Sequence, residues 1–310
     1  MSPATLPRAV SIREVGPRDG FQNEREIIST EDKVRLIGML ARSGLRRLEV
    51  TSFVRPDVIP QLADAEAVLA AIDVPDGVAL SVLVPNEHGL DRALELAARF
   101  HEVSCILSAS QTHNRHNVRR TIEQSLGELE RLIPRAAAGG LRAHAVISVA
   151  FGCPYEGEVS PQRVFEIASR LVEAGAAEIG FGDTTGMANP VQVARFFEQA
   201  RETLGGQVEL TAHFHNTRGQ GLANVLAALG AGCRSFESSF GELGGCPVPP
   251  GATGNIATED LVSMLEEMGI ATGVSLAGVL AAARAVREVL GRPLGSHTLI
   301  AGPIDWHRAS

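Results

Sequence analysis

The feature that most constrains the fold of this 310-residue chain is an alternation of short, β-rich apolar runs with helical patterns. The runs have the length of buried strands, and they are predicted at residues 10–15, 47–51, 78–82, 102–107, 143–149, 178–182, 209–214 and 235–238. Helices are predicted between and after them, at residues 30–43, 61–72, 87–99, 118–137, 161–174, 190–204, 222–229 and 258–268. Eight strand–helix units with short connections are typical of a parallel α/β protein.

Eight is also the number of strands that closes a (β/α)8 TIM barrel, and the length of the chain suits one. The barrel is predicted over residues 9–272, with an additional C-terminal helical segment over residues 273–310 that contains a helix at 274–290. A doubly wound open sheet is the alternative, but no G-x-G-x-x-G motif follows the first strand. No linker or low-complexity segment interrupts the chain, so residues 1–310 are predicted to form one domain.

Composition excludes several classes of partner and reaction. The 28 basic and 36 acidic residues give a net charge of −8, which argues against nucleic acids and anionic membrane surfaces as partners. No apolar run approaches the roughly 20 residues of a membrane span, and the N-terminus lacks the apolar core of a signal peptide, so the protein is expected in the cytoplasm. The one lysine, Lys33, is expected on a solvated helix face, which argues against Schiff-base and pyridoxal chemistry.

The four cysteines are widely spaced and form no C-x-x-C pair, so we expect reduced thiols and neither a zinc cluster nor a disulfide framework. They are Cys105, Cys153, Cys233 and Cys246.

Polar residues gather where the predicted strands end, which is where TIM barrels carry their sites. Arg18 and Asp19 follow the first strand between two glycines that permit close approach to a ligand, although a salt-bridged turn would look the same. His213 and His215 are two apart in the seventh strand and therefore face the same side, where both can meet one divalent ion. Two structural histidines are about as common for such a pair, but barrel closure brings Asp19 beside them and favours a metal site.

The loop after the eighth strand, GELGGCPVPPGATGNIATED, is long and rich in glycine and proline, as functional loops often are. It holds Cys246 between Gly245 and Pro247, and it offers the amide oxygen of Asn255 to a metal. One Asp, one Asn and two His form a donor set suited to Mg²⁺ or Mn²⁺ with positions left open for substrate. Glu49, in a buried strand, is expected inside the barrel near Arg18, with a purely structural ion pair as the alternative.

Six motifs together resemble the hydroxymethylglutaryl-CoA lyases over residues 10–275: GPRDGFQNE, LEVTSFV, GCPYEG, GDTTG, the H-x-H strand and GGCP…GATGN…ATEDLV. The resemblance implies a metal-dependent carbon–carbon lyase that cleaves 3-hydroxy-3-methylglutaryl-CoA to acetyl-CoA and acetoacetate. It also implies an acyl-CoA thioester as substrate, Mg²⁺ or Mn²⁺ as cofactor and a homo-oligomer, dimeric or larger. By the same resemblance, the metal ligands are Asp19, His213, His215 and Asn255.

The resemblance also implies that Arg18 binds the substrate carbonyl and stabilises the enolate, that Cys246 is the catalytic loop cysteine and that Glu49 is the active-site glutamate. Asp19 or His213 is then the base for the substrate hydroxyl proton.

Some positions depart from the lyase pattern and leave the acyl group open. Asn216 and Arg218 stand where the lyases generally carry an Asp and an aromatic residue, and residues 248–250 (VPP) also differ. The segment after the fourth strand differs too, and its His113 and His116 either contact substrate or serve as capping or solvated groups. The alternatives are therefore another tertiary 3-hydroxyacyl-CoA, or a related Claisen-condensing enzyme.

A non-catalytic binding barrel would carry a broken ligand set, whereas all four predicted ligands are present. The groups that hold the coenzyme A phosphates are not identified by a motif, and Arg25 and Arg55 are candidates.

Overall fold

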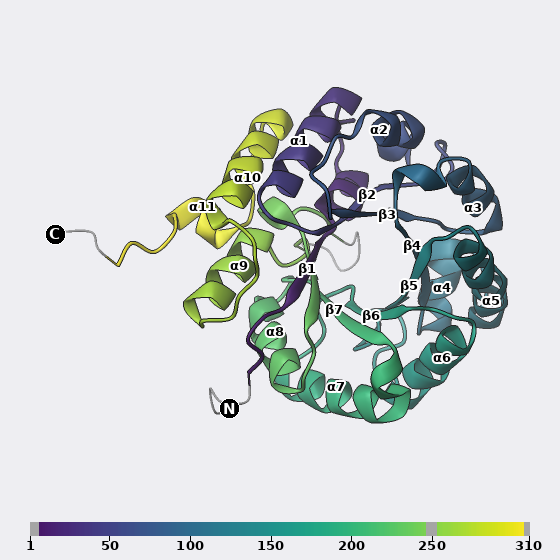
Figure 1. Ribbon diagram of the computed structural model, residues 1–310. Coiled ribbons are helices and arrows are strands. Elements are labelled where there is room, and N and C mark those ends of the chain that lie inside the picture. Colours follow the sequence, from purple (N-terminus) through teal and green to yellow (C-terminus); the bar gives the residue numbers. More distant parts are fainter. Residues whose placement is uncertain (1–5, 246–252, 307–310) are drawn as a thin grey trace.

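The computed structural model, which describes residues 6–245 and 253–306, is a closed barrel of eight parallel strands in sequence order. The strands are β1 Ser11–Glu14, β2 Arg47–Ser52, β3 Ala79–Leu83, β4 Glu102–Ser108, β5 Arg142–Ser148, β6 Glu178–Asp183, β7 Glu209–Phe214 and β8 Ser235–Ser238. Figure 1 looks into the barrel, with the helices arranged as a ring around the strands. Because β1 also pairs with β8, the predicted TIM barrel is confirmed and the open sheet is excluded.

Helices follow the strands along the described chain. They are α1 Thr30–Arg42, α2 Ala65–Ala71, α3 Glu87–Leu94, α4 Gln111–Val118, α5 Ile122–Ala138, α6 Pro161–Glu173, α7 Pro190–Leu204, α8 Gly221–Gly230, α9 Thr258–Glu267, α10 Leu276–Leu290 and α11 His297–Ala301. Side-chain caps fix where several begin: Ser29 accepts a hydrogen bond from the first turn of α1, and Thr121 forms a capping box with Gln124 at α5. No helix within the described ranges is long and apolar enough to cross a membrane.

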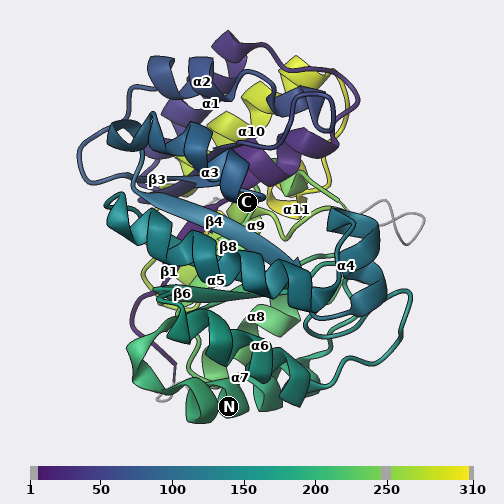
Figure 2. The same cartoon turned by 90° about the vertical axis from the view of Figure 1, so that its right-hand side faces the viewer.

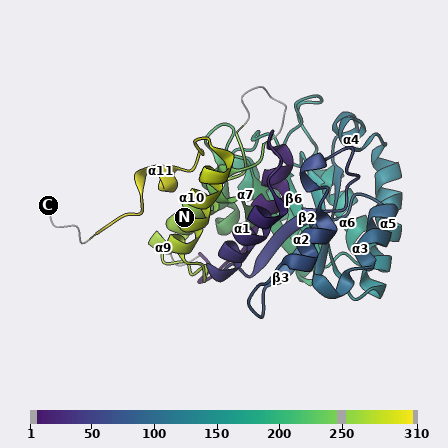
Figure 3. The ribbon, with the colours of Figure 1, turned by 90° about the horizontal axis from the view of Figure 1, so that it is seen from above.

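The C-terminal helices form the predicted extension outside the ring. Helix α10 packs on α1, and α11 packs on α9, so both lie together at one side of the barrel (Figures 1 and 3). The α11 helix begins where the Asp260 carboxylate accepts hydrogen bonds from the backbone N–H groups of His297 and Thr298. The extension is thereby attached to the helix that follows the eighth strand.

The apolar core lies between the strands and the helices. For example, Phe181 of β6 meets Phe196 and Phe197 of α7 edge to face, with ring centroids 4.9 and 5.9 Å apart. Figure 2 shows α3, α5 and α6 covering the strands from outside, with α4 set at one end of the barrel. The inside of the barrel is different, because much of it is polar.

Charged residues fill the barrel interior at the amino ends of the strands. Arg13 Nη2 lies 2.8 Å from a carboxylate oxygen of Glu102 and 2.8 Å from one of Glu178. We call the group the basal ion cluster, and its members are Arg13, Arg47, Glu102, Arg142, Glu178 and Glu209.

Four local predictions are corrected by the structure. Helix α4 was not expected, because its sequence QTHNRHNV has no apolar residue before its last position. The helices predicted at 61–72 and 87–99 are shorter: a 3₁₀ turn, Pro60–Leu62, precedes α2, and another, Ala97–Arg99, follows α3. The helix predicted from residue 118 begins at Ile122, after the Thr121 cap.

Lys33 is not on a solvated face but buried, with its Nζ 2.6 Å from Asp64 Oδ1 and 2.6 Å from the Gln61 carbonyl oxygen. A partner carboxylate allows the ammonium group to be buried. Lys33 does not line the central cavity described below, so it is not placed for Schiff-base catalysis there.

Candidate active site

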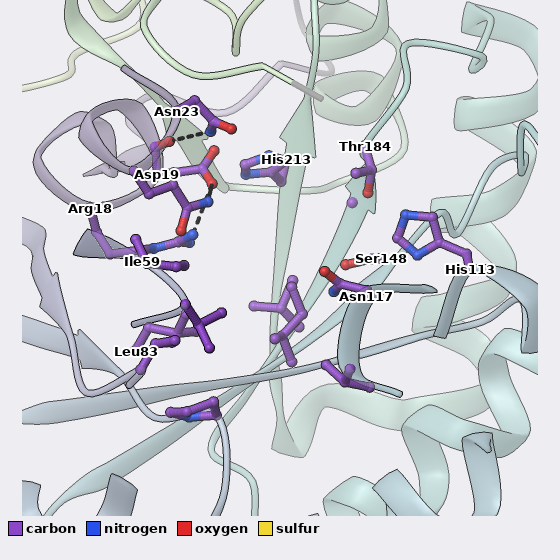
Figure 4. A pocket seen from close by; sticks show the side chains of 18 of the residues that line it. Arg18, Asp19, Asn23, Ile59, Leu83, His113, Asn117, Ser148, Thr184 and His213 are labelled. Carbon is purple, nitrogen blue, oxygen red and sulfur yellow. Dashed lines mark hydrogen bonds and ion pairs between the residues drawn. The ribbon is translucent and has the colours of Figure 1, made fainter. Parts of the chain in front are cut away.

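A cavity of about 730 Å³ opens at the carboxyl ends of the strands. Residues that lie in the eight strands or in the segments that follow them line it. Figure 4 shows two polar walls, one of them formed by Arg18, Asp19 and Asn23. The cavity is therefore where the fold concentrates its chemistry, as expected for a TIM barrel.

Arg18 and Asp19 lie in a tight five-residue turn, Gly16–Gly20, that directly follows β1. The glycines of this turn face other parts of the chain: a Cβ on Gly16 would lie 2.5 Å from the Phe240 ring, and one on Gly20 would lie 2.7 Å from Leu243 Cβ. They therefore allow the turn to pack against the segment after β8. That packing sets the position of Arg18 and Asp19.

Asp19, His213 and His215 converge on one point. One ligand atom from each residue lies within 4.8 Å of the others, and the two histidine Nε2 atoms are 3.1 Å apart. Both histidines are buried at the end of β7. Burial and the neighbouring His213 lower the pKa of His215 to about 3, so its imidazole is neutral and retains a lone pair for a metal.

Asn255 completes the set of predicted ligands. Its Nδ2 donates to Asp19 Oδ2 over 2.7 Å, and its Oδ1 is buried without a hydrogen-bond partner among the described residues. Such an orphaned oxygen beside a carboxylate and two imidazoles suits a divalent cation. Gly244 has a φ of +94°, and a Cβ there would lie 2.6 Å from Asn255 Nδ2, so only a glycine allows this approach.

Arg18 lies between two carboxylates. Its Nη1 is 2.8 Å from Asp19 Oδ1, and its Nε is 2.5 Å from Glu49 Oε2, so Glu49 has the position expected beside Arg18. Against the lowering effect of burial, the charges of Glu49 and Asp19 raise the pKa of Arg18. Although burial opposes its ionisation, Asp19 has a pKa below its ordinary value, mainly because of Arg18. Arg18 is therefore a fixed cation and Asp19 a fixed anion.

Glu237 belongs to the site but was not predicted from the sequence. It lies in β8, lines the cavity, and its Oε2 accepts a hydrogen bond from His213 Nδ1 over 2.8 Å. Although burial opposes ionisation, His213, His144 and Arg13 hold the pKa of Glu237 far below its usual range. A carboxylate inside a short buried strand was the available signal, and the same signal identified Glu49.

The second polar wall faces Arg18 and Asp19 across the cavity and consists of His113, Asn117, Ser148 and Thr184 (Figure 4). His113 is buried, and its Nδ1 is 2.6 Å from Ser108 Oγ. His116, which was predicted together with His113, also lines the cavity and stacks on Tyr155 with ring centroids 4.7 Å apart. Burial lowers the pKa of His113, so this wall is largely uncharged.

The remaining predicted residues have separate outcomes. Cys246 lies outside the described residues, although Gly245 before it lines the cavity. Arg55 lines the cavity and Arg25 does not. Asn216 donates to Glu242, and Arg218 donates to the carbonyl oxygens of Thr185 and Gly186, so both departures from the lyase pattern hold loops together.

The three described cysteines are buried and unpaired, and burial raises the pKa values of Cys105 and Cys233 to about 12.

A family model described as HMGL-like matches residues 9–286 of this chain. The chain belongs to the HMGL-like family. A curated Bacillus subtilis relative named hydroxymethylglutaryl-CoA lyase is 45% identical over 293 residues, which cover 94% of this chain and 97% of that protein.

Two further relatives are named for different substrates. The solved structure of an HMG-CoA lyase from Acinetobacter baumannii, in complex with coenzyme A and 3-methylmalate, has a TM-score of 0.91 and 40% identity, with all of both chains covered. A Chloroflexus aurantiacus relative named (R)-citramalyl-CoA lyase is 41% identical over 306 residues, which cover 96% of each chain. Relatives that are about equally similar to this chain thus have different substrates in their names.

Proposed function

We propose that this chain is a carbon–carbon lyase that cleaves 3-hydroxy-3-methylglutaryl-CoA to acetyl-CoA and acetoacetate with the help of Mg²⁺ or Mn²⁺. The observation that carries the proposal is the convergence of Asp19, His213 and His215 beside Arg18 in the central cavity. Membership of the HMGL-like family and the names of relatives at 41–45% identity support the same activity.

In this proposal Asp19, His213, His215 and Asn255 hold the ion, and their mixed oxygen and nitrogen donors suit Mg²⁺ or Mn²⁺. When bound, such an ion supplies Lewis acidity that lowers the pKa of a substrate hydroxyl. Of the two bases predicted for the hydroxyl proton, Asp19 is the one proposed here, because His213 Nδ1 donates to Glu237 and its Nε2 faces the ion.

The chain's other residues act on the thioester. As the C2–C3 bond breaks, its electron pair passes to the thioester, and the new enolate oxygen carries negative charge. Arg18 neutralises that charge, and the contact with Glu49 keeps the guanidinium in place. We propose that the Cys246 thiol then donates a proton to C2 to complete acetyl-CoA, because a glycine-flanked loop allows the thiol to approach.

An (R)-citramalyl-CoA lyase activity is the second candidate. It is supported by the Chloroflexus aurantiacus relative, whose identity to this chain equals that of some relatives named hydroxymethylglutaryl-CoA lyase. The ion site and Arg18 serve either thioester, since both proposals need a bound hydroxyl and an enolate. The difference lies in the acyl group.

A substrate panel tests the proposal and separates the two candidates. Purified protein with Mn²⁺ is incubated with each CoA thioester, and acetyl-CoA is measured by mass spectrometry. Acetyl-CoA and acetoacetate in equal amounts from 3-hydroxy-3-methylglutaryl-CoA support the first candidate. Turnover of (R)-citramalyl-CoA alone supports the second, and formation of acetyl-CoA from neither contradicts both.

The assembly and location of the protein remain predictions. We propose a homo-oligomer, dimeric or larger, in the cytoplasm, and light scattering and cell fractionation are the tests. The acyl-CoA partner is supported by the coenzyme A in the complex of the Acinetobacter baumannii relative. That residues 1–310 form one domain is likewise a proposal.

A further inference from the structure

We infer that Glu237 is a positioning residue for the metal site, because it fixes the ring of His213 so that only Nε2 faces the ion. Arg13 holds Glu237 in turn. This inference extends the proposed function, on which the role of His213 as a ligand rests.

Strand register places three side chains at one level of the barrel. Glu237 of β8 is the register partner of His213 on β7 and of Arg13 on β1. All three side chains therefore point to the same side of the sheet, into the barrel. Glu237 lies between a cation and an imidazole without any loop being involved.

The contacts at this level are specific to each oxygen. Glu237 Oε2 is 2.8 Å from His213 Nδ1, and Glu237 Oε1 is 3.2 Å from Arg13 Nη1. Arg13 is fully buried and is itself held by Glu102 and Glu178, each 2.8 Å away. The carboxylate therefore has one orientation.

That orientation decides which nitrogen of His213 is free. An ionised carboxylate accepts hydrogen bonds and cannot donate them, so Nδ1 of His213 must carry a hydrogen. Nε2 is the nitrogen that remains for the ion, and it lies 3.1 Å from His215 Nε2, where the triad converges. A carboxylate behind a ligating histidine in this way fixes the ring and increases its basicity as a ligand.

The test compares Mn²⁺ binding by the full-length protein and its variants, without any thioester. Free Mn²⁺ is followed by its electron paramagnetic resonance signal. We expect Glu237→Gln to weaken Mn²⁺ binding about 10- to 100-fold. Glu237→Asp retains the carboxylate and is expected to recover most of the affinity.

Glu102→Gln is the matched control, because Glu102 does not contact His213 and Glu178 still holds Arg13 Nη2 when the Glu102 charge is removed. We expect its Mn²⁺ affinity to stay within about threefold of the wild type. Circular dichroism melts establish that each variant is folded. The inference is overturned if Glu237→Gln binds Mn²⁺ as tightly as the wild type, if Glu102→Gln loses as much, or if Glu237→Asp recovers nothing.

A second measurement needs no change to Glu237. The ring nitrogens are observed by NMR in ¹⁵N-histidine-labelled protein with saturating Mg²⁺. The signal of His213 is identified as the one that is absent in His213→Gln, and we expect it to show the hydrogen on Nδ1. Hydrogen on Nε2 would overturn the inference even if the variants did not fold. Because both measurements omit the thioester, a failure here is distinct from a failure of the lyase assay.

Discussion

The two ends of the barrel interior both bury charged side chains, but they arrange them in opposite ways. In the basal ion cluster, cations and anions alternate, so that Arg13, Arg47 and Arg142 each meet more than one carboxylate. At the carboxyl ends of the strands, donor atoms of Asp19 and two histidines point at one another and at a common centre. Alternating charges satisfy one another, whereas converging donors leave a place where a further ion could bind.

The largest effect on the free energy of unfolding is expected from a change in the basal ion cluster. Glu178→Gln removes a carboxylate that contacts Arg13 and Arg47, and breaking a buried ion pair costs about 3–5 kcal/mol. We expect this loss in the free energy of unfolding by urea denaturation. Activity of the folded variant should change less than threefold, since Glu178 contacts none of the converging donors. A loss of stability below about 1 kcal/mol would show that the base does not stabilise the barrel.

Asp19→Asn is expected to lower activity strongly and stability only slightly, the opposite of Glu178→Gln. The charge that would hold the ion is lost, so kcat/KM is expected to fall at least about 10²-fold, or roughly 3 kcal/mol in barrier height. The loss in the free energy of unfolding should be smaller than that of Glu178→Gln. Steady-state assays and urea denaturation measure the two quantities. Full activity of the variant in the presence of a chelator would contradict the proposed metal site.

A pH titration of stability sharpens the comparison. Burial and the charge of Arg13 lower the pKa of His144 at the base to about 4. Between about pH 6.5 and pH 4 the unfolded chain therefore binds a proton that the folded protein does not, so stability falls as the pH falls. The expected contribution is about 3 kcal/mol over this range.

His144→Gln is expected to flatten this part of the stability curve, measured by urea denaturation at several pH values. His88→Gln, at an exposed position on α3, is the control and should leave the slope as it is. An unchanged slope in His144→Gln would assign the pH dependence to other groups.

The smallest effect is expected from adding the ion. Binding to the folded state alone stabilises it by about 2.7 kcal/mol when Mn²⁺ is present at 100 times its Kd. We therefore expect a thermal midpoint several degrees higher, and no such shift in His215→Ala. A shift of equal size in His215→Ala would place the ion outside the converging donors.

Much of this arrangement was predictable from the sequence. The alternation of elements predicts the barrel, and barrel closure brings Asp19 near His213 and His215, as the structure shows. Short motifs suffice there because strand direction and register are fixed by the fold.

Other features depend on contacts between distant segments, and the sequence does not reveal them. Lys33 is buried because Asp64 lies opposite it, and α4 forms from a polar segment in which Ser110 caps the first turn and Asn114 anchors the helix to β4 and α5. Glu237 is a different case, since the reasoning applied to Glu49 would have found it. The roles of the site residues, including Cys246, remain predictions.

The pairing of β1 with β8 has a consequence for the order in which the protein folds. The Asn255–Asp19 hydrogen bond joins residues 236 positions apart, across the seam at which the last strand meets the first. Contacts of such long range form only after a large loop has closed, so they are expected late in folding. A half-made barrel lacks the complete set of donors, so the proposed ion site would be complete only once the barrel has closed.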